Sequence, residues 1–203
     1  MNNRKIDYDD HDLIRQFKEG SVDAMEKIVA KYEGPIFNFG LKMCGQTQDA
    51  EDIAQDTFVS AFRSLGEFRE ETKLKNWLFR IAANACIRKR RKKKYEPDRE
   101  LSLESMMPGN GDHGRYDIPD WSADPANVLL RSELKNIIDS AIETLPPKYR
   151  MVFVLRDIEG FTTEETAEIL GITLPSVKTR LHRARFFLRK DISDRFNEAM
   201  PNA

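Results

Sequence analysis

One segment in the middle of this 203-residue chain constrains its fold more than any other, because no regular element can pass through it. Residues 96–127 contain four prolines, three glycines and eight acidic side chains, opposed by two arginines. Proline lacks the backbone donor and glycine widens the backbone conformations, so neither a helix nor a strand is expected to continue there. We interpret 96–127 as a flexible acidic linker between two domains, 1–95 and 128–193. The alternative is a long ordered loop within one domain, but loops of this length are uncommon in compact domains.

Apolar residues recur at helical spacing on both sides of this linker, and no segment alternates as a strand would. The charged fraction, 33%, is high, which favours two small and separate cores. The predicted fold class is therefore all-α, with two small helical domains joined by the linker. Helices are expected at 10–19, 21–45, 48–65, 72–94, 127–144, 147–158, 163–170 and 174–190.

The net charge is −1, so the chain does not resemble a generic polycation that coats nucleic acid. The charge is nevertheless segregated along the sequence. Residues 73–94 carry ten basic side chains and no acidic one, and residues 178–190 carry six basic side chains. Two basic clusters joined by an acidic tether are the first indication of function.

The composition also bears on compartment and cofactors. No stretch approaches the roughly 18 apolar residues that span a bilayer, and the N-terminus lacks the apolar core of a signal peptide. Cys44 and Cys86 lie in apolar segments without CxxC spacing, which weakens the case for a disulfide framework or a structural zinc site. We therefore expect no membrane insertion, a reduced cytoplasmic location, no metal and no cofactor.

The strongest local pattern in the second domain is a short helix, a tight turn and a second helix. Thr162, with Glu165 three residues later, is a capping box that starts the first helix, and Gly171 ends it. Thr173 caps the second helix, and Pro175 lies in its first turn, where proline is tolerated. This spacing is typical of a DNA-binding helix-turn-helix, whose second helix enters the major groove.

Helical phase divides that second helix into two faces. The inner face is apolar and consists of Val177, Leu181, Ala184 and Leu188. The outer face carries side chains that can contact base edges, namely Lys178, Thr179, His182 and Arg183. Arg185, Arg189 and Lys190 are better placed for phosphates, which position a protein without specifying sequence. The alternative is a solvated basic face, and His182 has no second His or Cys nearby on its face to form a metal site.

In the first domain, residues 49–58 gather acidic side chains on one face of an expected helix. The face expected to point inward consists of Ile53, Phe58, Ala61, Phe62 and Leu65. The face expected to point outward consists of Glu51, Asp52, Gln55 and Asp56. Acidic clusters bind metals in two-metal nucleases, but they also stabilise a helix N-terminus electrostatically. The composition of the segment leaves these alternatives open.

The helix expected at 72–94 also has two faces. Its apolar stripe, at i, i+3 and i+4 spacing, consists of Leu74, Trp77, Leu78, Ile81 and Ala85. This phase makes Trp77 a core residue rather than an exposed stacking residue. The opposite face offers hydrogen-bond donors and consists of Asn76, Arg80, Asn84 and Arg88. Residues 89–94 extend the basic cluster, either to hold a nucleic-acid backbone or as a solvated helix end.

Four blocks in a fixed order carry a family resemblance. In the first domain they are the run at 49–58, and Phe-Arg at 68–69 followed by Asn-Trp-Leu-Phe-Arg-Ile-Ala-Ala-Asn at 76–84. In the second they are Leu-Pro-Pro-Lys-Tyr-Arg at 145–150 and Val-Lys-Thr-Arg-Leu-His-Arg-Ala-Arg at 177–185. Together they resemble the extracytoplasmic-function (ECF) sigma factors, small members of the bacterial sigma-factor superfamily. The resemblance covers nearly the whole chain outside the linker and the last dozen residues.

The resemblance implies a non-enzymatic promoter-specificity subunit of bacterial RNA polymerase. It assigns polymerase binding to Asp52, Gln55 and Asp56. It assigns the −10 element, which the first domain opens, to Phe68, Lys75, Asn76, Arg80, Asn84 and Arg88, with 68–75 as a loop that holds a flipped base. It assigns the −35 element to Ser176, Lys178, Thr179, His182, Arg183 and Arg185. The implied partners are core RNA polymerase, at its clamp region and flap, promoter DNA, and an anti-sigma factor that can be membrane-anchored.

Two departures from the family pattern and two rival interpretations accompany this resemblance. Pro175-Ser176 stands where the family usually has Gly-Thr, and Thr166 stands where it has an apolar residue. An ordinary operator-binding transcription factor would leave the blocks at 49–58 and 68–84 unexplained. An acidic-site nuclease needs metal ligands from several elements, whereas the acids here crowd on one helix without a His partner.

Overall fold

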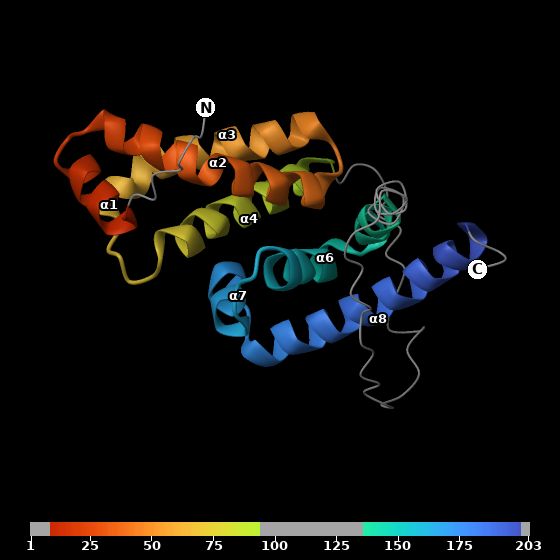
Figure 1. The fold of residues 1–203 in the computed structure, drawn as a ribbon. Helices are drawn as coiled ribbons and strands as arrows, with labels where there is room; N and C mark the ends of the chain where they lie inside the picture. Colours follow the sequence, from red (N-terminus) through yellow and green to blue (C-terminus); the bar gives the residue numbers. More distant parts are fainter. Residues whose placement is uncertain (1–8, 94–135, 200–203) are drawn as a thin grey trace, which may run out of the picture.

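The computed structural model describes residues 9–93 and 136–199, and every regular element in these two segments is helical. Figure 1 shows the first half of the chain as a bundle whose α4 faces the second half. The elements of the first half are α1 (Asp10–Lys18), α2 (Val22–Cys44), α3 (Thr47–Ser64), the 3₁₀ turn η1 (Leu65–Glu67) and α4 (Leu74–Lys93). The predicted all-α class is confirmed.

The second half contains the predicted helix-turn-helix. A helical segment at 136–144 is followed by α6 (Pro147–Phe153), the π-helical turn η3 (Val154–Ile158), α7 (Thr163–Leu170) and α8 (Leu174–Ala199). The linker expected at 96–127, and the part of the expected helix 127–144 that precedes residue 136, lie outside the described residues. The expected end of the last helix at residue 190 is wrong, because no Gly or Pro interrupts the sequence before Pro201 and an Asp191–Arg195 ion pair supports the added turns.

The helix ends that position the turn follow the sequence signals. Glu165 N donates to Thr162 Oγ1 at 3.1 Å, and Thr162 N donates to Glu165 Oε2 at 2.9 Å, which completes the predicted capping box. Gly171 adopts a left-handed φ of 63° at the C-cap of α7. Ser176 N donates to Thr173 Oγ1 at 3.4 Å at the start of α8. The turn between α7 and α8 is therefore capped on both sides by the predicted residues.

One close approach sets the position of α3 against α2. A Cβ at Gly40 of α2 would lie 3.1 Å from Ala50 Cα and 3.3 Å from Ala50 O in α3. A side chain at this position would make contacts tighter than almost all Cβ contacts and would push against backbone atoms, so glycine favours this close packing of the two helices. The absence of a side chain at Gly40 therefore lets the N-terminal half of α3, which carries the acidic face, pack closely against α2.

The two halves share one continuous core, so the expectation of two separate cores is wrong. Phe79 of α4 is fully buried, and its ring meets the Phe161 ring edge-on with centroids 4.8 Å apart. Figure 1 shows the corresponding arrangement, with α7 against the N-terminal part of α4. The composition of the segment between the two halves therefore does not predict whether the apolar faces on its two sides pack together.

Other composition-based expectations concern cysteines, metals and membranes. Cys44 and Cys86 are unbridged, and the Cys44 thiol together with burial raises the pKa of Cys86 well above its usual range. Within 9–93 and 136–199, no group of three or more His, Cys, Asp or Glu side chains is arranged to hold a metal ion. None of the helices in those ranges combines the length and the apolar character required to cross a membrane.

Candidate nucleic-acid interface

The predicted acidic face of α3 is exposed. Asp52, Gln55 and Asp56 all point to solvent, on the opposite side of the helix from its buried residues. Lys89 of α4 reaches this face, and its Nζ lies 2.6 Å from Asp52 Oδ2 and 2.9 Å from Asp49 Oδ1. Burial opposes the change, but the hydrogen bonds to Asp52 and Asp49 raise the pKa of Lys89. The face is therefore a partly compensated acidic surface that extends from α3 toward the basic end of α4.

An apolar groove lies beside this acidic face. It has a volume of about 580 Å³, and its lining includes Val29, Phe37, Gln55, Phe58 and Val59 from α2 and α3. The expectation that Phe62 packs inward is wrong, because the residue is 51% exposed, with its ring in a T-shaped contact with the Phe17 ring of α1 at 5.6 Å between centroids. The surface around Asp56 thus combines carboxylates with exposed apolar side chains, the composition of a protein-binding surface.

The loop before α4 is anchored at one end by stacked aromatic rings. Phe68 is buried, and its ring lies 4.8 Å from the Trp77 ring at an interplanar angle of 34°. Trp77 is partly buried against the core, as its helical phase predicts. Arg69, which follows Phe68 in the chain, has a side chain that is 84% exposed, so the loop buries the Phe68 side chain and exposes that of Arg69. Phe68 therefore supports the loop from inside rather than facing solvent.

The face of α4 opposite its apolar stripe is exposed along most of its length. Arg80, Asn84 and Arg88 point to solvent, as predicted. The expectation that Asn76 shares this exposure is wrong, since its side chain is 4% exposed. The physical reason is that α7 packs against this end of α4, where Asn76 hydrogen-bonds to Glu165.

Two lysines of the basic cluster contact the second half. Lys75 Nζ donates to Glu159 O at 3.2 Å and lies 4.4 Å from the centroid of the Phe161 ring. Lys73 Nζ donates to Glu165 Oε1 at 3.0 Å. The backbone N–H of Thr162 and then Lys73 lower the pKa of Glu165. Part of the surface expected to meet the −10 element is therefore covered in this compact arrangement.

Helix α8, the second helix of the helix-turn-helix, has the two predicted faces. Its inner residues are all buried: Val177, Leu181, Ala184 and Leu188. Lys178, Thr179 and His182 are exposed, whereas Ser176 and Arg183 are partly buried. Arg183 Nη1 donates to the Tyr149 hydroxyl of α6 at 3.3 Å, so this side chain is oriented by the preceding helix. The structure thus brings the base-facing candidates together on one strip of α8.

Arg185 differs from its neighbours because an internal carboxylate holds it. Its Nε and Nη2 donate to the two oxygens of Asp157 at 2.8 and 2.7 Å, a bidentate pair that raises the pKa of Arg185. Asp157 belongs to η3, in the segment just before the helix-turn-helix. The pair fixes the orientation of the Arg185 guanidinium, and a phosphate that bound there would have to share Arg185 with Asp157 or replace Asp157.

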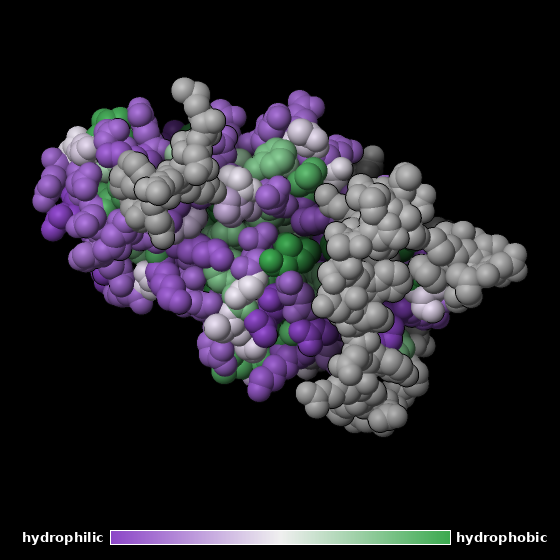
Figure 2. All heavy atoms as spheres, in the orientation of Figure 1, coloured by the Kyte–Doolittle hydropathy of each residue, from purple (hydrophilic) through white to green (hydrophobic). Residues whose placement is uncertain are grey.

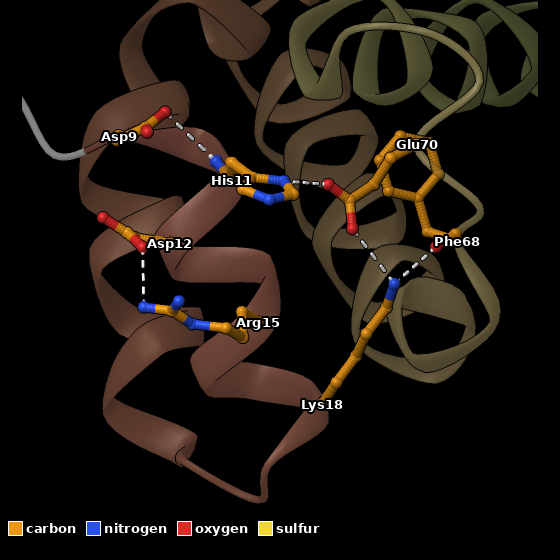
Figure 3. Close-up of polar contacts among 7 residues, drawn as sticks. All are labelled: Asp9, His11, Asp12, Arg15, Lys18, Phe68 and Glu70. Carbon is orange, nitrogen blue, oxygen red and sulfur yellow. Dashed lines mark hydrogen bonds and ion pairs between the residues drawn. The ribbon is translucent and has the colours of Figure 1, made fainter.

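Two structural features near the candidate surfaces were not predicted from the sequence. Arg150 of α6 is 9% exposed and donates to backbone carbonyls in both halves, and only its place in the 145–150 block marked it. Glu70 adopts a φ of 58° and contacts His11 and Lys18 of α1 (Figure 3). No sequence pattern predicts that a glutamate adopts a left-handed backbone conformation, so only the structure shows this contact between α1 and the loop.

A small groove between the two halves combines apolar walls with basic side chains. Its volume is about 190 Å³, and its lining includes Met43, Ile87, Met151, Arg90, Lys148 and Arg180. Figure 2 shows apolar side chains between the halves on a face that is otherwise mostly hydrophilic. The groove lies where α4, α6 and the helix-turn-helix meet, so it belongs to the contact between the halves.

Comparison with known proteins gives this arrangement a family. Residues 28–95 match the family model of Sigma-70 region 2, and residues 135–188 match that of Sigma-70, region 4. The chain is 39% identical over 184 residues to the "ECF RNA polymerase sigma factor SigW" of Bacillus subtilis, across 89% of this chain and 95% of that protein. The chain belongs to the ECF sigma factors. The resemblance stated from its four sequence blocks is confirmed.

Further relatives of this ECF sigma factor agree in sequence and in fold. It is 30% identical over 195 residues to the RNA polymerase sigma-H factor of Pseudomonas aeruginosa, across 94% of this chain and 97% of that one. The solved structure of CnrH in complex with the cytosolic domain of CnrY matches it with a TM-score of 0.63 at 25% identity, across 91% of this chain and 97% of that one. The sigma factor RpoE of Bartonella quintana, solved with the anti-sigma factor NepR, shares the fold with a TM-score of 0.61 at 23% identity.

Proposed function

We propose that this ECF sigma factor is the promoter-specificity subunit of a bacterial RNA polymerase, which binds core enzyme, recognises −35 and −10 elements, melts the start region and later leaves. The observation that carries the proposal is the presence, in one chain, of a region 2 match and a region 4 match whose candidate surfaces are separate. The proposal includes no catalytic step, no metal and no cofactor. Its work is done where polymerase and promoter DNA lie, in the cytoplasm.

Polymerase binding is assigned to the acidic face of α3. The proposed contacts with the clamp of core polymerase are Asp52, Gln55 and Asp56. Their exposure on one face of α3, which packs closely against α2 at Gly40, supports this assignment. The adjoining groove supplies apolar area that charged side chains alone would lack. A carboxylate face bordered by exposed apolar residues suits a basic, amphipathic helical partner.

The −10 element is assigned to the first domain, 1–95. Arg80, Asn84 and Arg88 offer donors along the exposed face of α4, while Phe68, Lys75 and Asn76 surround its N-terminal end. Extruding a nucleobase from a duplex costs a few kcal/mol. A loop that is anchored by a buried aromatic ring and presents exposed hydrogen-bond donors is physically suited to hold the extruded base. We infer that the 68–75 segment, which consists of the 68–73 loop and the first two residues of α4, captures the unpaired strand and that the exposed face of α4 follows its backbone.

The −35 element is assigned to the second domain, 128–193. Lys178, Thr179, His182 and Arg183 lie along one strip of α8 and are placed to read base edges, with Arg183 oriented by Tyr149. Ser176 lies at the start of the recognition helix, and Arg185 lies beside Asp157, where both are suited to phosphates. This assignment uses the outer face of α8 and leaves its buried face to the core.

Simultaneous reading of both elements requires the halves to separate. Two elements about 17 base pairs apart are about 58 Å apart at 3.4 Å per step. A fully extended segment of 32 residues, such as 96–127, spans about 100 Å at 3.3 Å per residue. The compact arrangement covers Asn76 and engages Lys75, so we infer that polymerase binding exchanges the contacts between the halves for contacts with DNA and core enzyme.

An anti-sigma factor is the proposed regulator. The Bartonella quintana sigma factor of the same fold was solved in complex with an anti-sigma factor, and this complex supports a partner of that kind for this chain. A regulator that holds the compact arrangement would keep the −10 surface covered. The flap of core polymerase is the proposed partner of the second domain.

A gel shift with and without core polymerase tests the proposed function. The isolated protein should bind promoter DNA weakly and in a salt-sensitive manner, because its net charge is −1. Added core enzyme should produce a sequence-specific complex and a transcript. Tight, sequence-specific binding by the protein alone would instead support an ordinary operator-binding transcription factor.

A further inference from the structure

We propose that α1 fixes the conformation of the 68–73 loop, and that Lys18 and His11 are positioning residues for recognition of an unpaired −10 base. The proposal rests on the proposed function, which assigns this loop to the −10 strand. It adds a helix that lies outside the matched region 2 segment, which begins at residue 28. The loop is held by a set of polar contacts from His11 and Lys18 of α1 to Phe68 and Glu70 (Figure 3), which we call the polar clamp to distinguish it from the clamp of the polymerase.

The clamp engages the loop at two successive points. Lys18 Nζ donates to Phe68 O at 2.8 Å and lies 3.2 Å from Glu70 Oε1. His11 Nδ1 contacts the other oxygen of the same carboxylate, Glu70 Oε2. Figure 3 shows both side chains reaching from α1 toward Glu70. A backbone carbonyl and both carboxylate oxygens of the loop are therefore held from one helix.

The backbone of Glu70 shows why the loop needs this clamp. Within 9–93 and 136–199, Glu70 is the one non-glycine residue with a positive φ, 58°. A residue with a Cβ adopts this conformation only where its surroundings hold it, and such positions cluster at functional sites. The contacts with His11 and then Lys18 lower the pKa of Glu70, so the charged carboxylate is the form that the clamp retains. Strain in the loop and polar contact from α1 thus meet at the same residue.

The clamp determines which side chains of the loop are presented. Phe68 and Glu70 are held, whereas Arg69 and Glu71 are 84% and 79% exposed. Arg69 Nη1 lies 3.9 Å from Glu71 Oε1, too far for a hydrogen bond, so neither side chain is fixed by the other. Held and presented residues alternate, and α1 therefore orients Arg69 and Glu71 toward the solvent where an extruded base would enter. A loop whose backbone is fixed before its ligand arrives loses less conformational entropy when it binds.

The same helix provides a matched control. Arg15 pairs with Asp12 three residues away at 2.7 Å, and Figure 3 shows this pair on the side of α1 away from the loop. If the contacts of α1 served only to stabilise exposed charge, loss of either pair would have the same small effect. If Lys18 positions the loop, only its loss changes what the loop reads.

The test uses reconstituted holoenzyme and a promoter library with randomised −35 and −10 elements. Transcripts made by the wild-type protein first define its preferred bases. The preference is then measured for Lys18→Ala, Lys18→Arg, Glu70→Gly and Arg15→Ala, with 2-aminopurine fluorescence in the −10 element reporting base extrusion. We expect Lys18→Ala to reduce discrimination at one −10 position about tenfold, as loss of a good polar contact does. Its −35 preference and its binding to core should be unchanged.

Two further variants separate the clamp from simple stability. Lys18→Arg retains a donor that reaches the loop and should restore most of the preference. Glu70→Gly keeps the left-handed backbone without strain and removes the contacts of the carboxylate with His11 and Lys18, although Lys18 can still donate to Phe68 O. It should therefore reduce the −10 preference in the same direction as Lys18→Ala, even if it unfolds at the same urea concentration as wild type. Unchanged −10 preference and extrusion in Lys18→Ala and Glu70→Gly, or equal losses in Arg15→Ala, would overturn the positioning role. Failure of the wild-type holoenzyme to select any −10 sequence would count against the proposed function instead.

Discussion

Replacement of Arg150 by methionine should destabilise the protein strongly, because this side chain satisfies backbone carbonyls from both halves. Its Nη1 donates to Met43 O of α2 at 2.9 Å, and its Nη2 donates to Leu145 O at 3.1 Å. It also donates to Glu143 O, within the helical segment 136–144. Burial lowers the pKa of Arg150 to about 10, so the guanidinium still carries its charge at neutral pH, where it also complements the negative C-terminal ends of these helices.

The expected magnitude follows from these contacts. A hydrogen bond from a charged donor contributes about 1.5–3 kcal/mol, and a buried carbonyl left without a donor costs about 1–3 kcal/mol. The hydrogen bonds to Met43 O and Leu145 O are buried and the one to Glu143 O is partly buried, while methionine fills part of the vacated volume. We therefore expect Arg150→Met to lower the free energy of unfolding by about 3–5 kcal/mol, as removal of one member of a buried polar network does.

Urea denaturation followed by circular dichroism measures this effect. Lys148→Met is the matched control, since Lys148 is exposed two residues away and should change the free energy of unfolding by less than about 0.5 kcal/mol. Because one contact of Arg150 reaches α2, its loss should also loosen the compact arrangement and increase the radius of gyration in solution. A loss of stability below about 1 kcal/mol in Arg150→Met would refute the reasoning.

Three further outcomes are expected. Asp56→Lys should abolish pull-down of core polymerase while leaving the circular dichroism spectrum unchanged, since the side chain faces solvent; normal assembly would contradict the assigned interface. Arg183→Ala should weaken transcription most at promoters with an intact −35 element. In a gel-shift series with holoenzyme and −35 variants, it should reduce the discrimination between bases at one or two −35 positions by about 1–3 kcal/mol; unchanged base preference would show that Arg183 does not read bases. Thr166→Val should raise the free energy of unfolding by about 1 kcal/mol, because the buried Thr166 hydroxyl has no hydrogen-bond partner among the described residues; destabilisation in urea would show that the hydroxyl is satisfied.

The sequence predicts local structure well where a short-range signal exists. The capping box of Thr162 and Glu165 and the left-handed Gly171 place α7 at the predicted residues, and the inner face of α8 follows from its period. The exposure of Asp56 also follows from helical phase. These features depend on neighbours within one or two turns, and such information is present in the sequence of a single helix.

Features that depend on contacts between distant segments could not be predicted in this way. Asn76 has the phase of an exposed residue, yet α7 buries it. Phe62 has the phase of a core residue, but the bundle leaves it half exposed beside Phe17. The left-handed Glu70 depends on donors that lie more than fifty residues earlier in the chain. In each case tertiary packing, which a periodic pattern does not encode, decides the outcome.

Permanganate footprinting of promoter DNA tests the central claim most directly, because it detects unpaired thymines where the account places strand opening. Core polymerase with the wild-type protein should give reactive thymines in the −10 region, and neither component alone should do so. Asn84→Ala, whose side chain lies on the exposed face of α4, should retain binding to core and to the −35 element but lose this reactivity. Thymine reactivity equal to wild type in Asn84→Ala would contradict the assigned −10 surface, and absence of reactivity with the wild-type holoenzyme would contradict the account itself.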